Sequence, residues 1–263
     1  MSTYLIVGAT GKTGGRVASL LTGEHQVRAA SRHGAVHFDW AVSATFAPAV
    51  EGVDGLFLTV PGQAPEGAAR VGALLEIATR SGAKRVVLLS ARAAEFHPTG
   101  ALAAIEEVVR HGPLAHTVLR PSWFAQNFTE GFLAPDERGN VTAPTGVGLE
   151  PFVDLEDVAR VAVAALTTDA VNGTIGISGS EALSFGEAVD VLGHASGRTL
   201  HFDAADPVQY RSALAEQLPE EYVAWRMAMF DAIRDGRDAY LSSGVEDVLG
   251  RPARSFSRWA AEL

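Results

Sequence analysis

Apolar runs rich in β-branched residues alternate with longer stretches of helical periodicity through the first half of the chain. The runs are "TYLIVG" (3–8), "QVRAAS" (26–31), "GLFLTV" (55–60), "KRVVLLS" (84–90) and "AHTVLRP" (115–121). Helices are expected between them at about 13–22, 65–81 and 99–111. This alternation indicates an α/β fold with a doubly wound parallel sheet, whose ligand crevice lies beyond the carboxyl ends of the strands.

The alternation weakens after Pro121, and from about Leu183 the pattern is mainly helical with dispersed aromatic residues. We therefore expect a core at 1–180, with some insertions after about 121 that belong to a smaller lobe. That lobe, at 181–263, is expected to be mainly helical and to pack over the crevice. "FVDLEDVARVAVAALT" (152–167) predicts a further helix capped by Asp154, with structural carboxylates in its first turn.

Composition excludes several classes of protein. The 263 residues are 47% hydrophobic and carry a formal net charge of −10, which disfavours disorder and any general attraction to nucleic acid or anionic membranes. Cysteine is absent, so disulfides, thiolate nucleophiles and Cys-based zinc sites are impossible. The N-terminus has no basic lead-in and no long apolar segment, and we expect a cytoplasmic protein. The oligomeric state stays open.

A glycine-rich turn follows the first apolar run. Gly8, Gly11 and Gly14 are spaced G-x-x-G-x-x-G between a strand and an amphipathic helix. Glycines at Gly8 and Gly11 permit a sharp turn and a close approach to a pyrophosphate, while Gly14 lets the helix lie close to the sheet. This context predicts a dinucleotide site, and a bare connecting turn is the alternative.

The end of the second strand predicts which dinucleotide binds. An acidic residue there would bind a ribose 2′-hydroxyl, whereas this chain has Ser31, Arg32 and His33. Arg32 is expected to pair with a 2′-phosphate and Ser31 to donate its hydroxyl, which favours NADP(H) over NAD(H). The alternative is a solvated arginine at the end of a strand.

At these motifs the chain resembles the NmrA-like branch of the atypical short-chain dehydrogenase/reductases, near its quinone- and azo-reductase-like members. The resemblance covers nearly the whole chain. Its most specific motifs are "VGATGKTGGRV" (7–17) and "TVLRPSWFAQNF" (117–128), and "DVLGRPARSFSRWA" (247–260) supports the quinone- and azo-reductase-like subgroup. The resemblance implies a Rossmann core that binds NAD(P) and a small substrate lobe.

The resemblance also implies residue roles at matching positions. The pyrophosphate would be held by Gly8, Thr10, Gly11, Lys12, Thr13 and Gly14. Asp39 in "FDW" would face the adenine, unless it caps a turn, and the adenosine side would be lined by Thr59, Val60 and Pro61, unless 59–62 is only a strand exit. The residues implied toward the nicotinamide are Ser90, Pro121 and Trp123, and the polar amides implied toward the substrate are Gln126 and Asn127.

One element of typical short-chain reductases is missing. Their Y-x-x-x-K pair supplies a proton as hydride arrives, but the segment after the fifth run, "ARAAEFHPTGALAAIEEVVRHG", contains neither tyrosine nor lysine. Hydride transfer to an activated acceptor such as a quinone does not need that pair. His97 and Asn127 are the candidate catalytic residues, and an exposed loop histidine is the alternative for His97.

Other titratable groups predict no site. The eight histidines contain no recognised metal-binding pair, so no metal is expected. Glu106 and Glu107 project about 100° apart on a helix and are interpreted as a solvated face. Aromatic residues of the final lobe either line an apolar pocket for a planar substrate or form ordinary core.

The function predicted is an NADPH-dependent oxidoreductase that transfers hydride to a quinone, an azo compound or a conjugated aromatic carbonyl, without a Tyr-Lys pair. The substrate is expected to be a small planar or aromatic molecule. Two other functions stay open: an NADP(H)-sensing regulatory protein, and a redox-neutral biosynthetic enzyme on the same fold.

Overall fold

The computed structural model describes residues 1–61 and 66–263. Gly62, which ends the motif "LTVPG", and Pro65, the first residue of an expected helix, lie outside the described residues. The chain forms two compact units, each built from separate stretches. The first contains 1–120, 155–176 and 247–250, and the second contains 121–154, 177–246 and 251–263. The expected assignment of 1–180 and 181–263 to cofactor and substrate binding stays a prediction.

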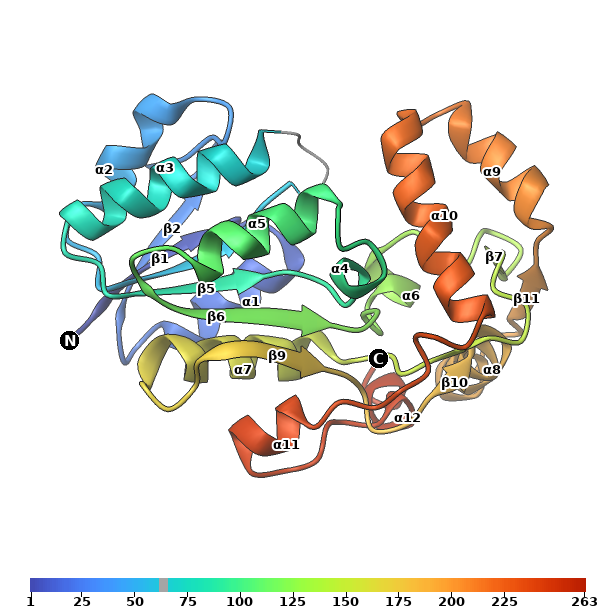
Figure 1. Ribbon diagram of the computed structural model, residues 1–263. Helices are drawn as coiled ribbons and strands as arrows, with labels where there is room; N and C mark the ends of the chain where they lie inside the picture. The colour runs from blue at the N-terminus through green and yellow to red at the C-terminus, as the bar shows by residue number, and fades with distance from the viewer. Residues whose placement is uncertain (62–65) are drawn as a thin grey trace. The chain divides into compact units, whose positions relative to one another are not determined.

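A seven-stranded parallel sheet organises the first unit, which confirms the α/β class (Figure 1). Its strand order is β3-β2-β1-β4-β5-β6-β9. The strands are β1 (Thr3–Val7), β2 (Gln26–Ser31), β3 (Val36–His37), β4 (Gly55–Thr59), β5 (Arg85–Leu89), β6 (Ala115–Pro121) and β9 (Gly173–Ile177). Strands β2 and β6 coincide with the predicted runs, and the chain crosses from one half of the sheet to the other between β3 and β4.

Helices cover both faces of this sheet. On one face α1 (Lys12–Leu21) packs against α7 (Leu155–Thr167), and on the other α3 (Gly67–Arg80) packs against α2 (Phe46–Val50) and α5 (Ala101–Arg110) (Figure 1). The short helices of this unit are η1 (Ser43–Thr45) and α4 (Ala93–Phe96). None of the helices in the described part of the chain has the length and apolarity needed to cross a membrane.

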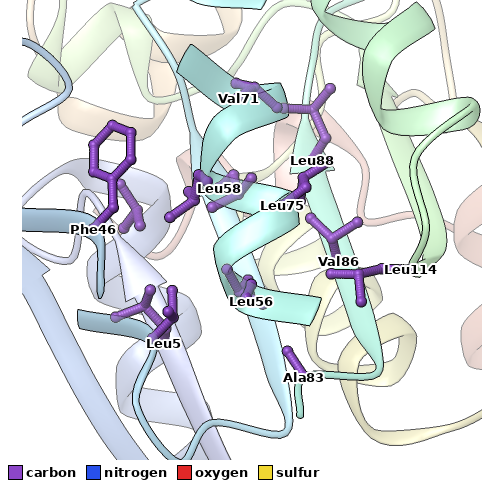
Figure 2. Close-up of a cluster of buried hydrophobic side chains, with 14 of the residues drawn as sticks. Leu5, Phe46, Leu56, Leu58, Val71, Leu75, Ala83, Val86, Leu88 and Leu114 are labelled. Atoms are coloured by element: carbon purple, nitrogen blue, oxygen red, sulfur yellow. The ribbon is translucent and has the colours of Figure 1, made fainter. Parts of the chain in front are cut away.

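The strands are apolar on both sides because both sides are covered. In β4, Leu56 and Leu58 belong to the core cluster beneath α3, while the intervening Phe57 is buried outside that cluster (Figure 2). Val71 and Leu75 of α3 fill the same cluster, and they lie one helical turn apart on one face. Alternate residues of the strand and residues four apart in the helix thus pack together in one core.

The second unit is mainly helical after Leu183. Its helices are α6 (Asn127–Glu130), α8 (Phe185–Ser196), α9 (Pro207–Ala215), α10 (Glu220–Arg234) and α12 (Phe256–Ala260), and the residues of α11 (Gly244–Leu249) are divided between the two units. Two small sheets pair β8 (Leu149–Glu150) with β10 (Leu183–Ser184) and β7 (Asn140–Ala143) with β11 (His201–Ala204).

Aromatic rings form the core of the second unit. The Phe152 ring centroid lies 5.2 Å from that of Phe128, 5.1 Å from that of Phe185 and 5.5 Å from that of Phe256. All four rings are buried, and their edge-to-face and tilted contacts suit the quadrupoles of aromatic rings. The four rings come from four separate segments of the chain, so this core forms only when those segments meet.

Candidate functional site

The glycine turn after β1 has a geometry that side chains would disrupt. Gly8 adopts φ +80°, and a Cβ there would lie 2.0 Å from the Thr59 Oγ1. A Cβ on Gly14 would lie 2.3 Å from the Gly8 carbonyl oxygen, so the first turn of α1 lies directly on the turn. Gly8 and Gly14 therefore permit a close approach of strand, turn and helix that no other residue would allow.

The N-terminus of α1 opens at this turn. Gly11 is the N-cap and contributes no side-chain hydrogen bond, and Gly15 is the residue whose amide bonds back to the Gly11 carbonyl at 2.9 Å. The amides of Lys12, Thr13 and Gly14 come before that bond, where a helix leaves its N–H groups without intrahelical partners. These amides and the positive end of the helix dipole suit a phosphate.

A cavity of about 720 Å³ surrounds this helix terminus, and all its lining residues belong to the first unit. Most predicted cofactor residues line it: Gly8, Thr10, Gly11, Lys12, Thr13, Gly14, Ser31, Arg32, Asp39, Thr59, Val60 and Pro61. His33, weighed beside Arg32, lines it too. The cavity also takes in Val7, Phe38 and Trp40, which were not predicted. Phe38 and Trp40 flank Asp39 within the "FDW" motif, which was the available signal for them.

Ser31 and Arg32 contribute unused donors to this cavity. The Ser31 Oγ is buried and has no hydrogen-bond partner among the described residues. Arg32 is exposed, and its guanidinium has no ion pair or hydrogen bond within the described part of the chain. A buried hydroxyl without a partner is unfavourable, and an anionic oxygen bound beside Arg32 would satisfy both groups.

Asp39 and Trp40 form the wall beside Thr59. The Asp39 Oδ1 accepts a hydrogen bond from the Ala41 amide at 2.8 Å, so Asp39 caps a turn while it also lines the cavity. The Trp40 Nε1 donates to the Thr59 carbonyl oxygen at 3.0 Å, and its ring packs edge-on against Phe38 at 5.0 Å between centroids. The indole is thereby fixed as a flat apolar surface, which suits an aromatic base.

The interpretation of Glu106 as part of a solvated face is wrong. Glu106 has no exposed surface, whereas Glu107 has a side chain that is 54% exposed. The Ser90 hydroxyl donates to the Glu106 carboxylate, and Arg120 binds it through Nε at 3.0 Å and Nη2 at 2.5 Å. The hydrogen bond to Glu106 is the largest cause that raises the pKa of Arg120. Burial of the Glu106 carboxylate is tolerated because the Arg120 guanidinium and the Ser90 hydroxyl donate hydrogen bonds to it.

Strand register explains how this network forms. Leu89 of β5 pairs with Thr59 of β4 on one side and with Leu119 of β6 on the other. Ser90 and Arg120 are the next residues along their strands, so both stand at the carboxyl edge of the sheet. Glu106 reaches them from α5, and Glu95 accepts a further hydrogen bond from Arg120 at 3.2 Å. The Ser90 hydroxyl is therefore held by Glu106.

His97 ends α4 and is partly buried. Its Nε2 is buried and has no hydrogen-bond partner among residues 1–61 and 66–263. The histidine is thus not simply exposed, although its catalytic role stays a prediction.

The other predicted residues belong to the second unit. Trp123 is 9% exposed, and its ring packs against Phe132, Phe185 and Phe230. The Gln126 Nε2 donates to the Asp154 Oδ1 at 2.6 Å, and Asp154 also pairs with Arg254 at 2.8 Å. Asn127 begins α6 and is partly exposed, and Pro121 is the buried last residue of β6. Their contacts with a substrate or nicotinamide stay predictions.

Comparisons with known proteins agree with this geometry. Residues 8–169 match the NAD(P)H-binding family. The uncharacterized oxidoreductase YesF of Bacillus subtilis is 36% identical over 270 residues, which cover 98% of this chain and 93% of that protein. The (4-alkanoyl-5-oxo-2,5-dihydrofuran-3-yl)methyl phosphate reductase of Streptomyces griseus is 30% identical and covers 98% and 96%.

Among solved structures, the NADPH-dependent quinone oxidoreductase QOR2 of Escherichia coli has the same fold. Its TM-score is 0.81 over 99% of both chains, at 18% identity. Together with the motifs at 7–17 and 117–128, these matches show that the chain belongs to the NAD(P)H-binding family, as an NmrA-like atypical short-chain dehydrogenase/reductase and an NAD(P)H-dependent oxidoreductase.

Proposed function

We propose that the protein is an NADPH-dependent reductase of the cytoplasm that transfers hydride to a quinone, an azo compound or a conjugated aromatic carbonyl. The observation that carries the choice of NADPH is the pair of donors formed by Ser31 and Arg32. Both line the cavity at the end of β2, and both have hydrogen-bonding capacity that the described residues leave unused. A 2′-phosphate would satisfy them, whereas a 2′-hydroxyl would not use the charge of Arg32.

Lys12 supports binding of the cofactor pyrophosphate at the glycine turn. Lys12 is the first residue of α1 and lines the cavity beside residues that present backbone amides. With a net charge of −10, the protein repels anions at long range, so a phosphate needs such local positive groups. The pyrophosphate is assigned to the glycine turn, and the 2′-phosphate to the end of β2.

The acceptor class follows from the missing acid. The chain has four tyrosines and only two lysines, Lys12 and Lys84, and Tyr4 is buried in β1. The other tyrosines, Tyr210, Tyr222 and Tyr240, belong to the second unit, which contains no lysine. NADPH, when bound, supplies a hydride. A quinone that receives it becomes a stabilised hydroquinone anion, which takes a proton from water and requires no strong acid.

The relatives support this class of acceptor. The Streptomyces reductase is named for a substrate whose carbonyl groups are conjugated, and the Escherichia coli structure is named a quinone oxidoreductase. Both names describe acceptors in which the added electrons are delocalised.

Fluorescence titrations with NADPH and NADH test the cofactor assignment. We expect the wild-type protein to prefer NADPH, and Arg32→Ala to weaken NADPH binding about tenfold or more while NADH binding is unchanged. Arg80→Ala is the control, because Arg80 is an exposed arginine on α3 that pairs with Glu76 at 3.8 Å and does not line the cavity. Equal affinity of the wild-type protein for both cofactors would contradict the 2′-phosphate site.

Turnover is tested separately with a panel of quinones, azo dyes and conjugated ketones. Consumption of NADPH, seen as loss of its reduced-nicotinamide absorbance, is expected with at least one acceptor, with one hydroquinone formed per NADPH for quinones. Saturable NADPH binding without any consumption across the panel would favour a cofactor-sensing regulator instead.

A further inference from the structure

The second unit contains a buried arginine that no carboxylate neutralises. Arg226 of α10 is 9% exposed and has no ion pair in the described part of the chain. Its Nη2 donates to the Tyr222 hydroxyl at 2.6 Å, and its Nε is buried without a hydrogen-bond partner. A guanidinium carries five donors, so most of the hydrogen-bonding capacity of Arg226 is unused.

Aromatic rings surround this charge. The Arg226 Cζ lies 4.2 Å from the centroid of the Phe132 ring and 4.9 Å from that of Tyr222. The Phe132 ring meets Trp123 at 5.4 Å, Trp123 meets Phe230 at 5.1 Å, and Phe230 meets Tyr210 at 5.6 Å. We call these six residues the arginine–aromatic cluster: Trp123, Phe132, Tyr210, Tyr222, Arg226 and Phe230. All belong to the second unit.

Packing alone does not explain an arginine at this position. A buried charge is unfavourable unless it is paired and hydrogen-bonded, and the contacts with Phe132 and Tyr222 offset only part of the loss of solvation. Well-packed hydrophobic residues often stabilise a core as much as a buried ion pair does, and a buried cation without its anion is less favourable still. The structure is therefore suited to an anion that arrives with a ligand.

We propose that Arg226 binds an anionic oxygen group of the substrate, such as a carboxylate, while the planar body of that substrate lies against Phe132, the exposed ring of the arginine–aromatic cluster. The planar guanidinium matches the two oxygens of a carboxylate, and the rings match an aromatic body. This inference rests on the proposed function only in calling the ligand a substrate.

Tyr210 adds a neutral donor to the cluster. Burial raises the pKa of Tyr210, and the charge of Arg226 and a hydrogen bond from it only partly oppose that effect. Its phenol therefore stays protonated at neutral pH and can donate a hydrogen bond to the same anionic group. The negative field of the whole chain repels anions, so a buried cation with an added donor gives selectivity that the surface does not.

Two matched probes test the proposal without requiring turnover. 2-Naphthoate and 2-naphthamide have the same aromatic body, and only the first carries an anionic oxygen group. Calorimetric titration of each into the NADPH-loaded protein is expected to show that the wild-type protein binds the naphthoate about tenfold more tightly. Arg226→Met should abolish this preference and leave the affinity for the naphthamide unchanged, and Arg226→Lys should restore part of it.

Arg211→Met is the matched control, because it removes the same charge from the exposed Arg211–Glu220 pair on the preceding helix. It should keep the preference for the naphthoate. The thermal midpoint of Arg226→Met should stay at or above the wild-type value, since the variant removes a buried charge without a partner. That result also shows that the variant is folded.

Equal binding of the two probes by the wild-type protein, no detectable binding of the naphthoate, or a preference that survives in Arg226→Met would each overturn the proposal. These outcomes are independent of hydride transfer. A protein that prefers the naphthoate but reduces no acceptor retains the anion site and loses the proposed reductase function. A protein that reduces quinones but shows no preference between the probes loses only the anion site.

Discussion

The Thr59 Oγ1 lies 2.0 Å from the position that a Cβ on Gly8 would occupy. The same hydroxyl donates to the Val7 carbonyl oxygen at 3.0 Å, so it ties the end of β4 to the end of β1. The conformation of the glycine turn thus depends on Thr59, a residue of the neighbouring strand that also lines the cofactor cavity.

Gly8→Ala is expected to weaken NADPH binding at least about tenfold, because the new methyl group would displace Thr59 and break its bond to Val7. Fluorescence titration measures the loss. Gly23→Ala is the control: Gly23 has a similar φ of +101°, but a Cβ there meets nothing within 4 Å. It should lower stability through backbone strain and leave NADPH binding intact. If the two variants bind NADPH alike, the close approach of Thr59 has no role in shaping the site.

Glu106→Gln is expected to lower the free energy of unfolding by about 2 kcal/mol, because Arg120 would lose its principal buried anion. Chemical denaturation measures this. Glu107→Gln, one residue along the same helix, removes an exposed carboxylate that pairs with Arg110 at 2.6 Å, and it should change stability by no more than about 0.5 kcal/mol. A similar loss in both variants would mean that the Ser90–Glu106–Arg120 network does not stabilise the sheet edge.

The capping box of α8 predicts a dependence of stability on pH. Glu187 accepts hydrogen bonds from the Ser184 amide and hydroxyl, both at 2.8 Å, and the bond from the amide is the largest cause that lowers the pKa of Glu187. A lowered pKa stabilises the folded state above the unfolded pKa of about 4.5, and this contribution is lost as the pH falls through the folded pKa.

Urea titrations of the wild-type protein and Glu187→Gln should therefore differ by a constant amount near neutral pH and converge on acidification. Glu181→Gln removes an exposed carboxylate that forms no hydrogen bond with residues 1–61 or 66–263, and it should track the wild-type protein throughout. A difference that persists unchanged into acid would show that the effect of Glu187 is not electrostatic.

Local sequence was sufficient for five strands of the sheet and for the glycine turn, but the edge strands β3 and β9 were not among the predicted runs. Strands β2 and β6 begin and end where their β-branched runs do, and Gly8, Gly11 and Gly14 line one cavity with Arg32, because each depends on residues adjacent in sequence. Trp40 was not predicted because its indole is held at the cavity by a hydrogen bond from Nε1 to the carbonyl oxygen of Thr59, which lies in a different segment of the chain.

Burial of charge was not predictable from the local pattern. Glu106 and Glu107 are equivalent in sequence, and only the arrival of Ser90 and Arg120 from separate strands makes one of them a buried anion. Arg226 presents the same difficulty. The residues beside it on α10 do not reveal that it lacks an ion pair among the described residues. In both cases the deciding contacts are between segments that the tertiary fold brings together.

The division of the first unit along the chain has a consequence for biosynthesis. Helix α1 packs against α7, and the edge strand β9 pairs with β6, yet α7 and β9 are translated only after the whole segment 121–154. A nascent chain of the first 120 residues therefore lacks the helix that packs against α1 until residue 167 has left the ribosome. The sheet that holds the cofactor cavity is completed later still, when β9 ends at Ile177, so protection of α1 by chaperones is most useful while residues 121–177 are being made.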